Sequence, residues 1–376
     1  MSEDKKPEWA DPENPDSFST VIRKGISRKE EDVVVERTTH FQKKVQNAPT
    51  IDELYEGVLA GNRSLIARAI TLIESNAEHH YKKSQELLQK LLPHCGKSIR
   101  IGITGVPGAG KSTFIEAFGT YLCDLGLKVA VLAIDPSSSI SGGSILGDKT
   151  RMEQLARNPR AYIRPSPSGG KLGGVHRKTR ETMLICEAAG FDCILIETVG
   201  VGQSEVIVRN MVDFFMLLVL TGAGDELQGM KKGIMEIADT IIVNKADGPN
   251  QMNALKTKEE YNRILHFLQP ATKGWETKAL SCSSITNDGI EAIWEMIQMF
   301  IKNTKSTGVF HDRRREQTKD WIYSMITDQL QASFFQNAEV KKLLPKIENE
   351  VICGDRTVTS AVENLFEVYY RTSIKK

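Results

Sequence analysis

The feature that most constrains this chain is the segment 105–112, which reads GVPGAGKS and matches the pattern G-x-x-x-x-G-K-[ST] at every fixed position. An apolar, β-branched run at 99–104 precedes it and predicts a strand, and the run at 113–118 predicts a helix. Glycines let the backbone adopt positive φ and approach an anion closely, so N–H groups and the helix N-terminus converge on it. We therefore expect a strand, a phosphate-binding loop and a helix in this order.

The lysine and the hydroxyl residue of such a loop have separate tasks. Lys111 would place its charge on the β- and γ-phosphates of a nucleotide, and the Ser112 hydroxyl would bind Mg²⁺. We expect the loop and the first helical turn to contact the nucleotide through Gly105, Val106, Pro107, Gly108, Ala109, Gly110, Lys111, Ser112 and Thr113. The alternative, a glycine-rich turn that binds nothing, is disfavoured because the motif lies between a strand and a helix.

A second motif indicates which base is bound. Asn244-Lys245-Ala246-Asp247 follows the strand-like run 240–243 and precedes a Gly-Pro turn, and it has the form N-K-x-D. The carboxylate of Asp247 can accept hydrogen bonds from N1–H and the exocyclic amine of guanine together. Adenine has an acceptor at N1 and would leave that charge desolvated and unpaired. Asn244, Lys245 and Asp247 therefore predict GTP and GDP as ligands.

Two carboxylates end other strand-like runs. Glu197 follows the run 194–196, with Gly200 three positions later, and this is the form of a segment that senses the metal and the γ-phosphate. Asp135 follows the run 129–134 and is a further candidate for the Mg²⁺ site, with a helix cap or turn as its alternative role.

The residue that follows Gly200 is unusual. Many GTPases carry a glutamine there that orients the attacking water, whereas this chain has Val201. A valine cannot hold a water molecule, so we expect slow intrinsic hydrolysis unless Gln203 or a partner completes the site.

Composition excludes several partners. The chain has 376 residues, and its 49 Lys and Arg nearly balance its 48 Asp and Glu, so no basic field predicts binding to nucleic acid or membrane. The longest apolar run, 214–220, is too short to cross a bilayer. The first residues lack the apolar region of a signal peptide and are too acidic for a mitochondrial presequence, which favours the cytoplasm.

Three regions follow from the patterns along the chain. Residues 1–98 are expected to form a flexible arm and a helical extension, and 99–305 a P-loop NTPase domain of the α/β class, a mostly parallel sheet with helices on both faces. Residues 306–376 are expected to form a helical arm that makes a homodimer. Its apolar residues at helical spacing are Trp321, Ile322, Met325, Ile326 and Leu330. The alternative is that this arm packs back on its own domain.

At this level the chain resembles a known family, the MeaB-type GTPase chaperones of adenosylcobalamin-dependent acyl-CoA mutases, formerly described as ArgK or LAO transport ATPases, within the G3E P-loop GTPases. The strings that carry the resemblance are DPSS at 135–138, SGGSILGDKTRM at 141–152, IRPSP at 163–167, LGGV at 172–175, ETVGVGQSE at 197–205 and GDELQG at 224–229. The resemblance extends over about residues 99 to 300.

The resemblance implies roles for further residues. Asp148 would lie in switch I and approach Mg²⁺, so the implied metal ligands are Ser112, Asp135, Asp148 and Glu197, and the implied catalytic residues are Lys111, Asp148 and Glu197. The segment 222–232 would be an additional switch that signals to the mutase through Asp225, Glu226, Gln228 and Lys231. From composition alone, a solvated loop is the alternative for that segment.

The chain departs from the family pattern in one loop. The family usually has Ser-Ala followed by a Gly-x-Gly-Ile turn, whereas this chain has Ser284 in the alanine position and Asn287 for the first glycine. Asn tolerates the left-handed conformation, so the turn should form. We expect Ser283 and Ser284 to line the guanine site and the backbone N–H of Ser284 to meet guanine O6, and we expect no role for the Ser284 side chain.

Taken together, the residues and the resemblance predict a Mg²⁺-dependent GTPase that gates cobalamin loading of a mutase such as methylmalonyl-CoA mutase, and that protects or reactivates it. A metallochaperone or scaffold for another metalloenzyme is one alternative, although the six cysteines form no C-x-x-C pair and are expected to be buried thiols. A transport-associated kinase is the other, although no second substrate site is recognisable.

Overall fold

The computed structural model describes residues 48–75, 77–135, 152–167, 172–198, 204–221 and 232–373. All of the elements named below belong to one compact unit, residues 49–376.

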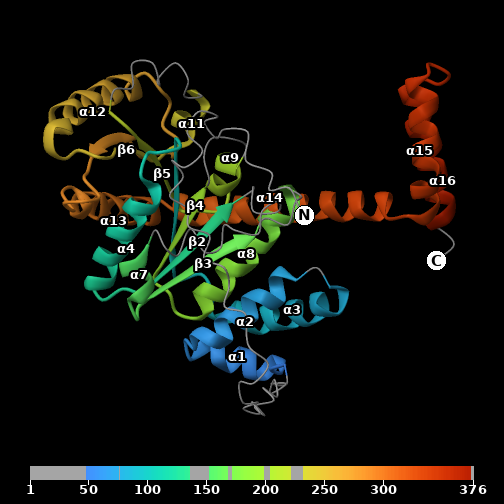
Figure 1. The fold of residues 1–376 in the computed structure, drawn as a ribbon, viewed down its shortest axis with the longest axis horizontal. Coiled ribbons are helices and arrows are strands. Elements are labelled where there is room, and N and C mark those ends of the chain that lie inside the picture. Colours follow the sequence, from blue (N-terminus) through green and yellow to red (C-terminus); the bar gives the residue numbers. More distant parts are fainter. Residues whose placement is uncertain are drawn as a thin grey trace, which may run out of the picture. The chain divides into compact units, whose positions relative to one another are not determined.

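A parallel sheet, with seven strands over the described residues, forms the centre of this unit (Figure 1). Its spatial order is β3-β2-β4-β1-β5-β6-β7. The strands are β1 (Ile99–Gly105), β2 (Val129–Asp135), β3 (Ala161–Pro167), β4 (Cys193–Thr198), β5 (Phe214–Val219), β6 (Thr240–Val243) and β7 (Lys278–Ser281). Every pairing is parallel, and β4 and β5 are buried along their whole length, as expected for strands covered on both faces. The predicted α/β class is confirmed.

Helices cover both faces of the sheet and build two separate cores. The helices around the sheet are α4 (Lys111–Asp124), α7 (Glu153–Arg157), α8 (Leu172–Ala188), α9 (Ser204–Arg209), α11 (Lys232–Ile237), α12 (Gln251–Leu265) and α13 (Ile290–Ser306), with the 3₁₀ turn η2 (Gly248–Asn250) before α12. Residues of α4, α7 and α13 share one core, and residues of α8, α9, α11 and α12 share the other. Neighbouring strand residues divide between them, since Leu195 faces the first core and Ile194 and Ile196 the second.

The N-terminal helices extend the second core. They are α1 (Ile51–Leu59), α2 (Arg63–Glu74) and α3 (Glu78–Leu91), followed by the turn η1 (Leu92–His94). A capping box starts α1, because the Thr50 hydroxyl accepts from the N–H of Glu53 and the Glu53 carboxylate accepts from the N–H of Thr50. Their apolar faces pack with α8.

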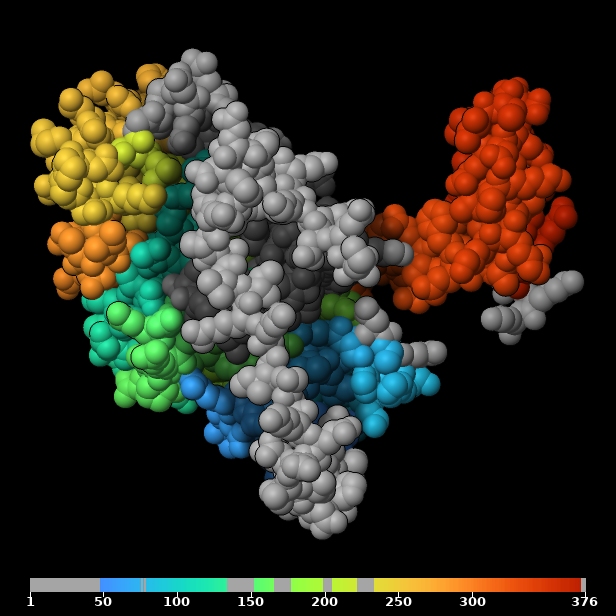
Figure 2. Space-filling view, in the orientation of Figure 1, coloured from blue at the N-terminus to red at the C-terminus, as the bar shows by residue number. Residues whose placement is uncertain are grey.

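The C-terminal region is helical, as predicted, and consists of α14 (Val309–Phe335), α15 (Ala338–Ile352) and α16 (Val358–Ser373). The last two pack together around a small third core of Val340, Ile347, Ala361 and Leu365, and Figure 2 shows them as one contiguous orange-red surface. No helix in the described ranges is long and apolar enough to cross a membrane.

The first turns of α14 pack back on the nucleotide domain. Arg314 contacts both carboxylate oxygens of Asp213 at 2.7 Å, and Asp213 directly precedes β5. Arg313 and Arg209 both contact Asp239, which directly precedes β6. Both aspartates have fully buried side chains. Their ion pairs therefore hold the first turns of α14 at the amino ends of β5 and β6. The packed-back alternative therefore holds for this part of the helix.

Candidate nucleotide-binding site

The loop between β1 and α4 has the conformation that its glycines predict. Gly108 and Gly110 have φ of 81° and 82°, in the left-handed region. A Cβ on Gly110 would also lie 2.9 Å from Nδ2 of Asn244, and one on Gly105 would lie 2.3 Å from the carbonyl oxygen of Leu218. Glycine is required at these positions because any side chain would force the loop away from its neighbours.

Lys111 is the first residue of α4 and folds back over this loop. Its Nζ donates to the carbonyl oxygens of Gly105 at 2.9 Å and Val106 at 3.2 Å. Burial lowers the pKa of Lys111, while the carboxylates of Glu197 and Glu205 raise it in part. The ammonium group is thus held at the loop, where an anion would also replace some of its lost solvation.

Ser112 lies against the acidic residue of β4. Its Oγ donates to Oε1 of Glu197 at 3.2 Å, and Glu197 is only 6% exposed. The pairing of β1 with β4 sets Glu197 opposite Ile103, and the next residue, Thr198, donates to the Thr104 hydroxyl at 2.8 Å. A hydroxyl and a carboxylate are oxygen ligands that suit Mg²⁺. The donor set therefore fits the predicted cation.

Other predicted metal and switch residues have less structural description. Asp135 ends β2, whose pairing sets Ile134 opposite Thr198, so its backbone lies at the same edge of the sheet. Five further predicted residues lie outside the described residues: Asp148, Asp225, Glu226, Gln228 and Lys231.

The base-recognition motif begins directly after β6. The Asn244 side chain is buried and its Nδ2 donates to the carbonyl oxygen of Ala109 at 2.9 Å, which joins this motif to the phosphate loop. Lys245 has a φ of 59°, a left-handed conformation that costs energy for a non-glycine residue and is typical of functional sites. Asn250 supports it by donating to its carbonyl oxygen at 2.7 Å.

The loop after β7 completes the site. Ser283 donates from Oγ to Oδ1 of Asp247 at 3.2 Å, which fixes the predicted guanine-reading carboxylate. Asn287 has a φ of 65°, so the turn forms in the left-handed conformation expected of it. The structure thus brings the residues after β6 and β7 together, and Asn244 links them to Lys111 and Ser112 through the loop.

No role was expected for the Ser284 side chain, but the structure shows that it makes a hydrogen bond. Its Oγ donates to Oδ1 of Asn244 at 2.8 Å, and the thiol of Cys282 approaches the same oxygen at 3.5 Å. The only available signal was the extra hydroxyl in the alanine position of the family pattern.

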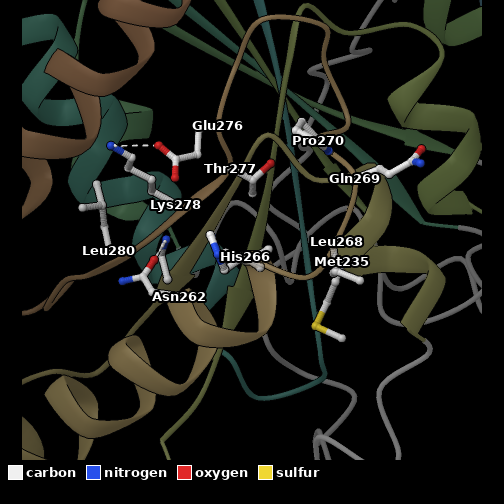
Figure 3. A pocket seen from close by; sticks show the side chains of 12 residues that line it. Met235, Asn262, His266, Leu268, Gln269, Pro270, Glu276, Thr277, Lys278 and Leu280 are labelled. Atoms are coloured by element: carbon white, nitrogen blue, oxygen red, sulfur yellow. Dashed lines mark hydrogen bonds and ion pairs between the residues drawn. The ribbon is translucent and has the colours of Figure 1, made fainter.

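Two pockets lie near these elements. The first pocket has a volume of about 330 Å³ and lies between α4 and the loop after β7. Thr113, Ser284 and Asn287 form part of its lining. The other, of about 500 Å³, lies between α12 and β7 and contains none of the predicted site residues (Figure 3). Lys278 and Glu276 at its rim pair with each other at 3.4 Å. The first pocket adjoins the candidate nucleotide site.

Comparison with known proteins decides the family. A sequence model of the family described as methylmalonyl Co-A mutase-associated GTPase MeaB matches residues 66–339, which is most of the chain. The chain belongs to the MeaB family. This confirms the resemblance drawn from the sequence strings.

The similarity of the chain to individual proteins supports the same family assignment. GTPase ArgK of Escherichia coli is 46% identical over 293 residues, which cover 78% of this chain and 88% of that protein. The mitochondrial methylmalonic aciduria type A homolog of Mus musculus is 41% identical over 329 residues, covering 85% and 79%. The crystal structure of an LAO/AO transport system kinase superposes with a TM-score of 0.69 at 37% identity, covering 85% and 97%. This MeaB-family chain is therefore a P-loop GTPase that binds guanine nucleotides.

Proposed function

We propose that this GTPase hydrolyses Mg²⁺-GTP slowly on its own and acts as a chaperone of an adenosylcobalamin-dependent acyl-CoA mutase, namely methylmalonyl-CoA mutase. In this role it gates cobalamin loading and protects or reactivates the mutase. The observation that carries the proposal is the family match over residues 66–339, because that family is described by its association with this mutase.

Within the phosphate site, Lys111 pairs with the β- and γ-phosphates after exchanging the loop carbonyls that it now contacts. Ser112, Asp135, Asp148 and Glu197 hold Mg²⁺, which when bound neutralises charge on the phosphate oxygens. The ammonium group of Lys111 neutralises charge that develops while water attacks the γ-phosphate, and the carboxylates of Asp148 and Glu197 would act by holding Mg²⁺. Val201 cannot orient that water, which supports a slow intrinsic rate.

In the base site, Asn244 and Lys245 hold the loop and Asp247 accepts from the guanine N1–H and amine. The hydrogen bond from Ser283 keeps Asp247 turned for this task. The backbone N–H of Ser284 meets O6 of the base.

The partner-facing elements are the segment 222–232 and the arm 306–376. Order in 222–232 that depends on the γ-phosphate reports the nucleotide state to the mutase through Asp225, Glu226, Gln228 and Lys231. The arm makes a homodimer through α14, where Ile322, Ile326 and Leu330 repeat every four residues and are 54%, 49% and 62% exposed. A groove of about 630 Å³ beside them supports a second copy as the occupant. The cytoplasm is the proposed location.

The test is GTP turnover by the full chain, measured alone and over a saturating titration of purified methylmalonyl-CoA mutase. Turnover is expected to rise with mutase and to saturate. A rate that stays constant over the whole titration contradicts gating and favours the scaffold alternative. GTP labelled on the γ-phosphate should release its label as inorganic phosphate, whereas label on a protein or amino acid would support the kinase alternative.

A further inference from the structure

Two adjacent hydroxyls in the loop after β7 contact two different residues of the N-K-x-D motif. Ser283 donates to Asp247, the residue proposed to read the base. Ser284 donates to Oδ1 of Asn244 at 2.8 Å, and Asn244 has no proposed contact with the edge of the base.

We propose that Ser284 is a positioning residue that slows release of the nucleotide, because its hydroxyl fixes the Asn244 amide that holds the phosphate loop. The proposal rests on the guanine-nucleotide site proposed above. It concerns how firmly the loop is held and leaves base selectivity to Asp247.

The polarity of the hydrogen bonds supports this role. The carbonyl oxygen of Ala109 can only accept, so the NH₂ group of Asn244 must face it, and Nδ2 donates there at 2.9 Å. Oδ1 must then face the loop after β7, where Ser284 donates to it at 2.8 Å. The other donor to Oδ1, the Cys282 thiol at 3.5 Å, is weaker. Ser284 is thus the stronger of the two groups that keep the amide in this orientation.

The packing around Asn244 couples its side-chain amide to the position of the phosphate loop. Asn244 is 1% exposed, so no bulk solvent replaces a lost partner. Its Nδ2 also lies within 2.9 Å of the place where a Cβ on Gly110 would be. The amide therefore binds Ala109 and lies beside Gly110. The N–H groups of both residues belong to the proposed phosphate cradle. A looser amide would let this part of the loop move and free the phosphates.

The experiment measures release of a fluorescent GDP from the full chain after a chase with excess GDP, together with the affinities for GDP and IDP. Inosine lacks the exocyclic amine, so the ratio of the GDP and IDP affinities reports contact with Asp247. Ser284→Ala is expected to speed release about five-fold, the effect of losing one hydrogen bond, and to weaken GDP and IDP equally. Ser284→Thr, which keeps the hydroxyl, is expected to restore slow release.

Two matched variants complete the design. Ser283→Ala is expected to reduce the preference for GDP over IDP, because it frees Asp247. Thr286→Ala removes an exposed hydroxyl of the same loop that donates to exposed Asp288, and it is expected to leave release unchanged. The melting temperature of each variant without nucleotide shows that the fold is retained.

Unchanged release in Ser284→Ala, with GDP binding intact in the unsubstituted chain, would overturn the positioning role alone. A change in the GDP to IDP ratio as large as that of Ser283→Ala would also overturn it, since the hydroxyl would then act on the base. Failure of the unsubstituted chain to bind GDP would overturn the proposed site itself, and that result is distinct from both.

Discussion

Ser112 donates from Oγ to Oε1 of Glu197 across 3.2 Å, so a hydroxyl from the first turn of α4 meets a carboxylate near the end of β4. The register between β1 and β4 fixes this meeting, because it sets Glu197 opposite Ile103, two residues before the phosphate loop. Two residues that are 85 positions apart thus meet at the proposed Mg²⁺ site.

The first prediction concerns Glu197→Gln, which keeps the shape and the acceptor for Ser112 but removes the charge. We expect the turnover number for GTP to fall about 100-fold with GDP binding retained, because the site would hold less firmly the cation that neutralises charge on the transferring phosphoryl group. Steady-state phosphate release over a Mg²⁺ titration measures this. Glu291→Gln, an exposed carboxylate at the start of α13, is the control, and full activity of the Glu197 variant at every Mg²⁺ concentration of the titration would contradict the assignment.

The second prediction concerns the ion pair between Arg314, in the first turns of α14, and Asp213. Arg314→Ala leaves the buried carboxylate of Asp213 without its bidentate partner, so the free energy of unfolding is expected to fall by about 3–5 kcal/mol. Arg315→Ala is a neighbouring control, because that side chain is 76% exposed and pairs only with exposed Asp312, and it should change stability by less than about 1 kcal/mol. Urea unfolding of both variants measures their free energies of unfolding. Equal values would refute the claim that Arg314 holds α14 on the nucleotide domain.

The phosphate loop and the N-K-x-D motif could be predicted because each is local in the sequence. A strand, five loop residues and a helix determine where Lys111 and Ser112 lie, and the family strings supply the rest of the nucleotide domain. The run Arg313-Arg314-Arg315 shows the limit. Nothing in the run indicates that the first two side chains reach buried aspartates and the third faces solvent, since Asp213 is 101 positions from Arg314.

The Ser284 contact could not be predicted for a related reason. Its partner, Asn244, is 40 positions away and directly follows another strand, and the family pattern has no hydroxyl there.

The cysteines give a mixed result. Burial was predicted for these thiols and is confirmed for Cys123, Cys186, Cys193 and Cys282, but Cys353 is exposed and Cys95 is only half-buried. Cys353 follows α15, where a helix end leaves it in solvent.

The third prediction follows from these thiols. The thiolate is the reactive form, and burial raises the pKa of Cys282 to about 12 and that of Cys95 to about 11. A raised pKa keeps a thiol protonated until the pH approaches that value, so at pH 8 iodoacetamide should alkylate Cys353 first in the folded chain. Peptide mass spectrometry over time resolves the sites. Modification of Cys282 as fast as that of Cys353 would contradict its burial.

The last prediction concerns the dimer. Ile326 lies at the centre of the exposed stripe on α14, so Ile326→Asp would place a charge inside the proposed interface, where desolvation without a partner is unfavourable. Light scattering after size exclusion should show a dimer for the unsubstituted chain and a monomer for this variant. Ser324→Asp adds the same charge two residues earlier, about 200° around the helix, and should leave the dimer intact. A monomeric unsubstituted chain, or dissociation by both variants, would refute the stripe as the interface.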